Sequence, residues 1–193
     1  MMIANFLVLV VTAIVCSGLQ HVRKIPSLHK PECKHQLSMV TDGVIVGAGR
    51  IGQFLYESNG KKDLLLSDRS APIPEGRGPI YVCTRNNDLD SIIAKTPSER
   101  LEDLVFLQNG VLTTYLKSKG LEENTQALIY LAVSSKGAAP IDGKTDLNPE
   151  GLTAVTGKWA TDFANRLHNS QMSCHVLEKK PWMVAMVSER ASE

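Results

Sequence analysis

Short apolar runs alternate with polar segments along the chain from residue 41 to residue 177. The runs are rich in Val, Ile and Leu and are bounded by Gly, Pro, Asp or Asn, as is typical of buried strands. We therefore predict strands at 43–46, 63–67, 79–84, 104–107, 127–133, 152–156 and 174–177. Capping residues and amphipathic spacing predict helices at 53–59, 89–95, 98–102, 111–119 and 159–168, and the apolar stretch 181–187 begins like another. This alternation predicts an α/β fold with a doubly wound, mainly parallel sheet and helices on both faces.

Two segments interrupt the alternation. Residues 70–79 are rich in proline and glycine, and we expect a loop there in place of the third strand and helix of a longer nucleotide-binding half. Residues 137–151 are rich in Gly, Pro, Asp and Lys, which predicts a loop or a hairpin turn.

A glycine-rich turn follows the first predicted strand and precedes a predicted helix. In a dinucleotide-binding unit the first glycine allows a sharp turn, the second lets backbone N–H groups approach a pyrophosphate, and the third allows close helix–strand packing. The free N–H groups and the dipole of the helix N-terminus then attract the phosphates. We predict a Rossmann-type domain with NADP or NAD as cofactor; a purely structural glycine turn in another α/β domain is the alternative. The cofactor-binding residues of the turn would be Gly47, Ala48, Gly49, Arg50, Ile51 and Gly52.

The preference of the domain for NAD or NADP depends on the end of the second predicted strand. Asp68 lies there, about 20 residues after the first glycine of the turn, where a carboxylate can accept hydrogen bonds from ribose hydroxyls and favour NAD. Arg69 and Ser70 follow immediately and could instead hold a 2′-phosphate, which favours NADP. Arg69 is also consistent with a solvated loop residue, so both cofactors stay open.

Charge and cysteine spacing exclude other classes of site. The net charge is +1 and no basic patch interleaved with aromatic residues is visible, so we expect no nucleic-acid partner. The cysteines are Cys16, Cys33, Cys83 and Cys174, and no pair has the spacing of metal ligands. We expect reduced thiols and no metal site.

The N-terminal segment 1–40 differs from the rest of the chain. Residues 3–15 form a nearly continuous apolar run, and the segment 21–34 is basic. This pattern favours a plastid-targeting leader that consists of a signal-like core and the basic segment after it. A signal anchor that leaves the domain facing the cytosol, and a cytoplasmic protein with a misassigned start, are the alternatives. We expect a leader or anchor at 1–40, a dinucleotide-binding domain at 41–170, and the start of a helical region at 171–193.

The order of the motifs resembles the ketopantoate reductase (2-dehydropantoate 2-reductase) family. The resemblance is carried by the glycine turn 44–52, by the segment 82–89 (Val-Cys-Thr-Arg-Asn-Asn-Asp-Leu) and by 107–111 (Leu-Gln-Asn-Gly-Val). It implies an NAD(P)H-dependent reductase of a small 2-keto acid, with Thr84 and Arg85 along the cofactor. It also implies that Asn109 lies near the nicotinamide and the substrate, as the candidate catalytic residue. From the residue types alone, a tight turn is the favoured interpretation of Asn109 and Gly110.

The end of the sequence departs from the family pattern. The family places a catalytic lysine and a second asparagine just after a tryptophan, on the helix that opens an all-helical substrate domain. If Trp182 is that tryptophan, the corresponding positions hold Val184 and Ser188. A truncated helical domain would leave apolar surface around Trp182 and Met186 exposed, open to a second copy or another protein partner. A non-catalytic dinucleotide-binding protein, or truncated paralogue, is therefore the alternative to an active reductase.

A reductase or epimerase of another Rossmann family is a third hypothesis. Tyr115 and Lys119 match the Tyr-x-x-x-Lys spacing of such enzymes. Their predicted helix follows Gln-Asn-Gly rather than a serine-bearing strand, so we interpret the match as chance.

Overall fold

The computed structural model describes residues 41–68, 70–146, 149–179 and 182. The predicted leader, Arg69, Val184, Met186 and Ser188 lie outside the described residues. The elements in chain order are β1 (Val44–Val46), α2 (Arg50–Ser58), β2 (Leu64–Leu66), β3 (Ile80–Val82), η2 (Asn86–Asp88), α3 (Leu89–Lys95), η3 (Ser98–Asp103), β4 (Leu104–Phe106), α4 (Thr113–Ser118), β5 (Thr125–Leu128), β6 (Leu131–Ala132), β7 (Ile141–Asp142), β8 (Ala154–Thr156), α5 (Ala160–Asn169) and β9 (His175–Val176).

A seven-stranded sheet with the order β2-β1-β3-β4-β5-β8-β9 forms the centre of the fold. The strands from β2 to β5 are parallel to their neighbours, β8 is antiparallel to β5, and β9 is parallel to β8. The predicted Rossmann-type, mainly parallel sheet is therefore confirmed. Since β9 belongs to it, the sheet extends past residue 170.

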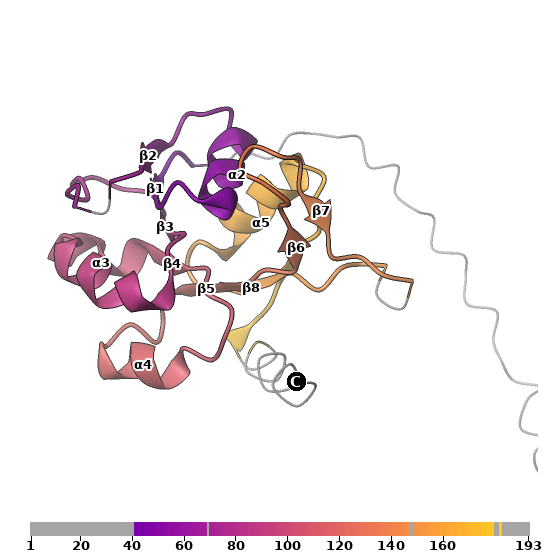
Figure 1. Ribbon diagram of the computed structural model, residues 1–193. Coiled ribbons are helices and arrows are strands. Elements are labelled where there is room, and N and C mark those ends of the chain that lie inside the picture. The colour runs from indigo at the N-terminus through magenta and orange to yellow at the C-terminus, as the bar shows by residue number, and fades with distance from the viewer. Residues whose placement is uncertain (1–40, 69, 147–148, 180–181, 183–193) are drawn as a thin grey trace, which may run out of the picture. The chain divides into compact units, whose positions relative to one another are not determined.

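Helices cover both faces of the sheet, as Figure 1 shows. The strand β3 illustrates the alternation: Tyr81 packs with α2 and α5 on one face, whereas Ile80 and Val82 pack with α3 and α4 on the other. All three side chains are fully buried. A shift of a strand by one residue would move each of its side chains to the opposite face of the sheet. The packing on the two faces therefore holds even short strands in register.

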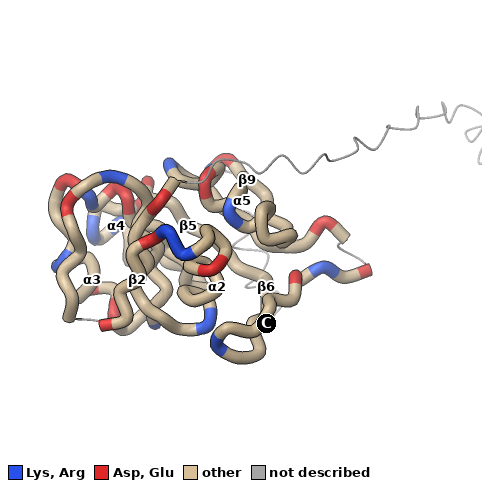
Figure 2. The backbone as a smooth tube through the Cα atoms, turned by 90° about the horizontal axis from the view of Figure 1, so that it is seen from above, with Lys and Arg blue, Asp and Glu red and all other residues tan. Residues whose placement is uncertain are grey.

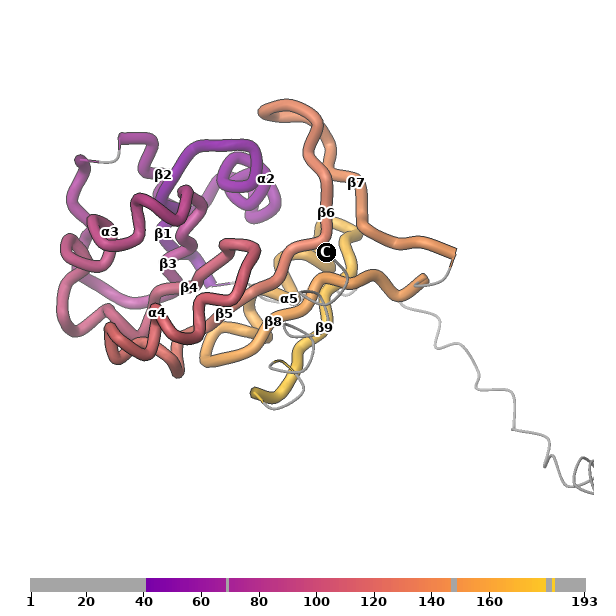
Figure 3. The backbone as a smooth tube through the Cα atoms, turned by 60° about the horizontal axis from the view of Figure 1, so that its bottom comes forward, coloured from indigo at the N-terminus to yellow at the C-terminus, as the bar shows by residue number. Residues whose placement is uncertain are grey.

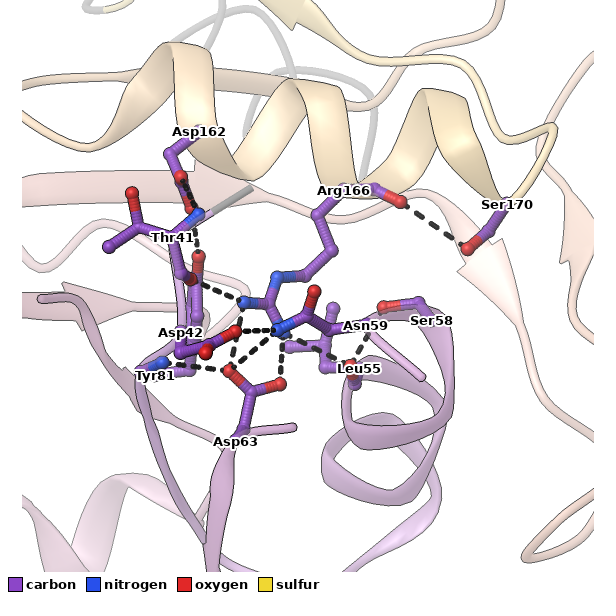
Figure 4. A network of polar contacts seen from close by, with 11 residues as sticks. Thr41, Asp42, Leu55, Ser58, Asn59, Asp63, Tyr81, Asp162, Arg166 and Ser170 are labelled. Atoms are coloured by element: carbon purple, nitrogen blue, oxygen red, sulfur yellow. Dashed lines mark hydrogen bonds and ion pairs between the residues drawn. The ribbon is translucent and has the colours of Figure 1, made fainter. Parts of the chain in front are cut away.

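A buried ion pair fixes α5 against the connection between α2 and β2 (Figure 4). Arg166 binds both carboxylate oxygens of Asp63, at 2.5 and 3.0 Å, and both side chains are wholly inaccessible to solvent. The guanidinium also donates to the carbonyl oxygens of Leu55 and Thr41 and lies 4.6 Å from the ring centroid of Tyr81. These partners offset the large cost of removing two charges from water.

Two predicted elements differ from the structure. The helix after the glycine turn begins at Arg50 rather than residue 53, so the last glycine of the turn is already helical. The prediction of one strand at 127–133 is wrong, because β5 ends at Leu128 and β6 belongs to a separate two-stranded sheet with β7. Hydrogen bonds of Tyr130 explain the break: its N–H donates to Thr153 Oγ1 and its carbonyl accepts from Gly143.

The segment 137–151 contains β7, which pairs antiparallel with β6 and forms a hairpin with it. Figure 3 shows the hairpin rising beside α2. A hydrogen bond of 3.0 Å from Arg50 Nη1 to the carbonyl oxygen of Val133 joins the two elements. The hairpin is thereby held next to the N-terminus of α2.

Candidate dinucleotide-binding site

The glycine turn between β1 and α2 has three glycines with three different steric environments. Gly47 has φ +105°, and a Cβ atom there would lie 2.9 Å from the carbonyl oxygen of Cys83. A Cβ atom on Gly52 would lie 1.9 Å from the carbonyl oxygen of Gly47. Gly49 is the N-cap of α2 and has no atom within 4 Å of its Cβ position. The first and third glycines therefore serve the turn and the packing, and the second borders open space.

An open cleft of about 650 Å³ lies in front of this turn. It is bounded by the residues that follow β1 and β3, at the carboxyl ends of these parallel strands. The chain runs from β1 to β2 on one side and then returns to β3 on the other, so the cleft lies at a topological switch point. The lining residues are Gly47, Ala48, Gly49, Arg50, Ile51, Ser67, Cys83, Thr84, Arg85 and Lys136.

The charged residues that line the cleft are all positive. Arg50, Arg85 and Lys136 line it, and none of its described lining residues is acidic. Figure 2 shows that charges of both signs are otherwise interspersed along the backbone. Three cations beside the free N–H groups of a helix N-terminus favour an anion such as a pyrophosphate.

The sequence did not indicate Lys136 as a site residue. It lies on the β6–β7 hairpin, far along the chain from both Arg50 and Arg85, and no local motif marks it. The structure brings it to the cleft because the hairpin is held beside α2.

Asp68 lies at the exposed end of β2. Its carboxylate accepts hydrogen bonds from the backbone N–H of Ser70, at 2.8 Å, and from the Ser70 hydroxyl, at 2.8 and 2.7 Å. These bonds hold the pKa of Asp68 below its usual value. Ser67, rather than Asp68, is the residue of this strand end that borders the cleft.

A second recess of about 310 Å³ adjoins the cleft and shares Ile51 and Thr84 with it. It lies over the ends of β3, β4 and β5, on the side of the glycine turn away from β2. The exposed side chain of Asn109 borders it, and Asn109 Nδ2 donates to the carbonyl oxygen of Ile129 across 3.5 Å. The complete lining is Ile51, Thr84, Asn86, Leu107, Gln108, Asn109, Ile129 and Leu131. Asn109, Thr84 and the glycine turn thus surround one continuous surface.

Cys83 borders the cleft as an unreactive thiol. Burial raises its pKa to about 12, so the thiolate is scarce at neutral pH. Both described cysteines, Cys83 and Cys174, are free. Cys83 therefore supplies a small apolar wall rather than a nucleophile.

Two further features noted in the sequence do not contribute to the site. Tyr115 and Lys119 both bind Asp90, at 3.0 and 2.7 Å, and neither borders the cleft or the recess. The prediction of exposed apolar surface at Trp182 is wrong, because Trp182 is 3% exposed and packs with Leu128 and Ala154. The structure therefore provides no support for a partner surface at this tryptophan.

Two solved structures of one family are similar to this chain. A dimeric ketopantoate reductase from Staphylococcus aureus has 17% identity and a TM-score of 0.45 over 71% of this chain and 55% of its own. A probable 2-dehydropantoate 2-reductase from Bacillus subtilis has 14% identity and a TM-score of 0.46, over 77% of this chain and 62% of its own. This chain thus spans less than two thirds of either protein. Both similarities are likenesses of fold to structures of the family that the motifs resemble.

A scan against protein-family models and a search of curated proteins each gave no match. Within the described ranges, no helix is both long and apolar enough to cross a membrane.

Proposed function

We propose that the domain binds a nicotinamide dinucleotide, NADP or NAD, across the cleft and the recess. The observation that carries this proposal is the cleft at the switch point between β1 and β3. The N-cap of α2 opens into it, three cations line it, and the Cβ position of Gly49 is free of neighbours. A pyrophosphate needs these features: exposed backbone N–H groups, close backbone approach and positive charge.

The two halves of the dinucleotide then have separate positions. The adenosine ribose lies toward Ser67 and Asp68 at the end of β2, and the nicotinamide lies in the recess beside Asn109. Asp68 keeps lone pairs for ribose hydroxyls even while it accepts from Ser70. A free carboxylate there favours NAD, and the nearby cations favour NADP.

Variants of Gly49 test the pyrophosphate position. Asp and Asn are both favourable N-cap residues, and the open Cβ position gives either of them room. Gly49→Asp places a negative charge where the phosphates bind, whereas Gly49→Asn fills the same space without charge. We expect ADP-ribose, which contains the pyrophosphate but no nicotinamide, to bind at least about tenfold more weakly to the Asp variant than to the Asn variant. Equal binding to the two variants would place the pyrophosphate elsewhere.

We further propose reduction of a small 2-keto acid, in which a bound nicotinamide cofactor would supply the hydride and water would supply the proton. The side-chain amide of Asn109 borders the recess and has a second N–H with which to bind and orient a carbonyl oxygen. Oxidation of NADPH or NADH in the presence of 2-keto acids tests this activity. Asn109→Ala should lower turnover while the affinity for the dinucleotide changes little, and equal turnover in both proteins would remove Asn109 from the reaction.

A non-catalytic dinucleotide-binding protein is the second candidate. The observation that favours it is the recess lining, where none of the described residues has an acidic, basic or imidazole side chain. A positioned general acid typically contributes about 10²–10⁴-fold to such a reaction. Saturable dinucleotide binding without turnover of any 2-keto acid would favour this candidate.

A further inference from the structure

Two residues that line the recess each carry a buried polar side-chain atom without a hydrogen-bond partner among the described residues. Gln108 is only 8% exposed, and its Oε1 is buried without a hydrogen-bond partner. The hydroxyl oxygen of Thr84, Oγ1, is buried and unpartnered as well. Both residues line the recess, and Thr84 also lines the cleft. Buried polar atoms are nearly always paired, so this pair needs a ligand or a bound water.

The orientation of the Gln108 amide is fixed by the strand ends on which it lies. Its Nε2 donates to the carbonyl oxygen of Val82 at 2.9 Å and to that of Thr84 at 3.1 Å. A flipped amide would place Oε1 against these two carbonyl oxygens, where no donor exists. Oε1 is therefore an acceptor that needs an N–H or O–H group from outside the protein.

The two atoms together match one chemical group. Oε1 of an amide can only accept a hydrogen bond, whereas a threonine hydroxyl can also donate one. The two residues are neighbours, since the Gln108 side chain donates to the backbone carbonyl oxygen of Thr84. A primary carboxamide carries an NH₂ donor and a carbonyl acceptor on the same carbon, so it complements an acceptor beside a hydroxyl.

We propose that Gln108 Oε1 and Thr84 Oγ1 bind the carboxamide of the nicotinamide ring, an inference that rests on the proposed dinucleotide binding. Gln108 accepts from the carboxamide NH₂, and Thr84 donates to its carbonyl oxygen. The recess lies over β3, β4 and β5, opposite the ribose position at β2, so the nicotinamide half of the cofactor reaches it. Gln108 is then a specificity residue that senses the NH₂ group of the cofactor.

Cofactor analogues test this assignment on the unaltered full-length chain. The 3-acetylpyridine analogue of the dinucleotide replaces NH₂ by a methyl group, whereas the thionicotinamide analogue keeps NH₂. ADP-ribose lacks the ring and serves as the reference for the other contacts. Calorimetry should give about tenfold weaker binding for the acetylpyridine analogue than for the nicotinamide form, because a buried acceptor is left unpaired. The thionicotinamide analogue should bind within about threefold of the nicotinamide form.

Protein variants complete the test. In Gln108→Met the difference between the nicotinamide and acetylpyridine forms should vanish. Thr84→Val, which keeps the shape of the side chain, should weaken both forms alike because both retain the carbonyl group. Thr84→Ser should restore the affinity.

Each failure has a distinct signature. Equal affinities of the unaltered protein for the nicotinamide and acetylpyridine forms, both tighter than ADP-ribose, would overturn the role of Gln108 and leave dinucleotide binding intact. The absence of binding by all of these ligands, ADP-ribose included, would overturn the proposed function together with this inference.

Discussion

The contact between Gly52 and Gly47 leaves no room for a side chain on the first turn of α2. A Cβ atom on Gly52 would lie 1.9 Å from the carbonyl oxygen of Gly47 and 3.3 Å from Cβ of Cys83. The obstacle is backbone, which cannot move aside as a flexible side chain can. The contact holds the N-terminus of α2 against the ends of β1 and β3, where its first residues line the cleft.

Gly52→Ala should therefore damage both the fold and the site. We expect the free energy of unfolding to fall by about 1–3 kcal/mol, as for other substitutions that overfill a packed region. Gly49→Ala is the matched control, because its Cβ meets no atom, and it should cost less than about 1 kcal/mol. Denaturant unfolding measures both. Equal costs would show that the helix does not approach the turn in this way.

The cations of the cleft should determine the affinity for dinucleotides and its salt dependence. Lys136→Gln removes one charge at the edge of the cleft and should weaken NADPH or NADH binding by about tenfold, because a charge-assisted contact is lost. Binding should also become less sensitive to salt. Lys117→Gln, at an exposed position on α4, is the control and should leave the affinity unchanged. A similar loss in both variants would indicate a general charge effect.

Removal of one partner of the buried ion pair should be costly. Asp63→Asn leaves the guanidinium of Arg166 buried without a counter-charge and should lower the free energy of unfolding by about 3–5 kcal/mol. The exposed pair between Lys119 and Asp90 offers the comparison, and Lys119→Gln should leave Tm unchanged. If Asp63→Asn unfolds at the temperature of the unaltered protein, the pair is not buried as described.

The thiols of Cys83 and Cys174 should resist alkylation. Burial raises the pKa of each to about 12, above the ordinary value, so the protonated form dominates until the pH approaches that value. At about pH 8.5, where an exposed cysteine is half ionised, iodoacetamide should label neither site in the folded protein. Peptide mapping by mass spectrometry measures labelling, and unfolding in denaturant should expose both. Rapid labelling of Cys83 in the folded state would contradict the raised pKa of its thiol.

The glycine turn could be predicted from sequence because its requirements are local. Positive φ at Gly47 and the close approach at Gly52 are imposed by neighbours a few residues away. The alternation of apolar residues likewise predicted the strands and the helices on both faces, since β1, β3, β4 and β8 are buried on both sides.

Other parts of the site depend on contacts between distant segments. Lys136 reaches the cleft only because the β6–β7 hairpin is held beside Arg50, a contact across 83 residues of sequence. The end of β5 depends on Thr153, which captures the N–H of Tyr130. The unpaired Oε1 of Gln108 follows from the alignment of β3 with β4, which places two carbonyl oxygens at its Nε2. No local pattern carries this information.

The measurement that tests the central claim most directly is a titration of the full-length protein with NADPH and with NADH, followed by nicotinamide fluorescence. We predict saturable binding of at least one dinucleotide, and the loss of this binding in Gly49→Asp. The dinucleotide that binds more tightly identifies whether the site prefers a 2′-hydroxyl or a 2′-phosphate. A protein that unfolds cooperatively on heating, and is thus folded, yet binds neither dinucleotide would contradict the account and leave the glycine turn a purely structural feature.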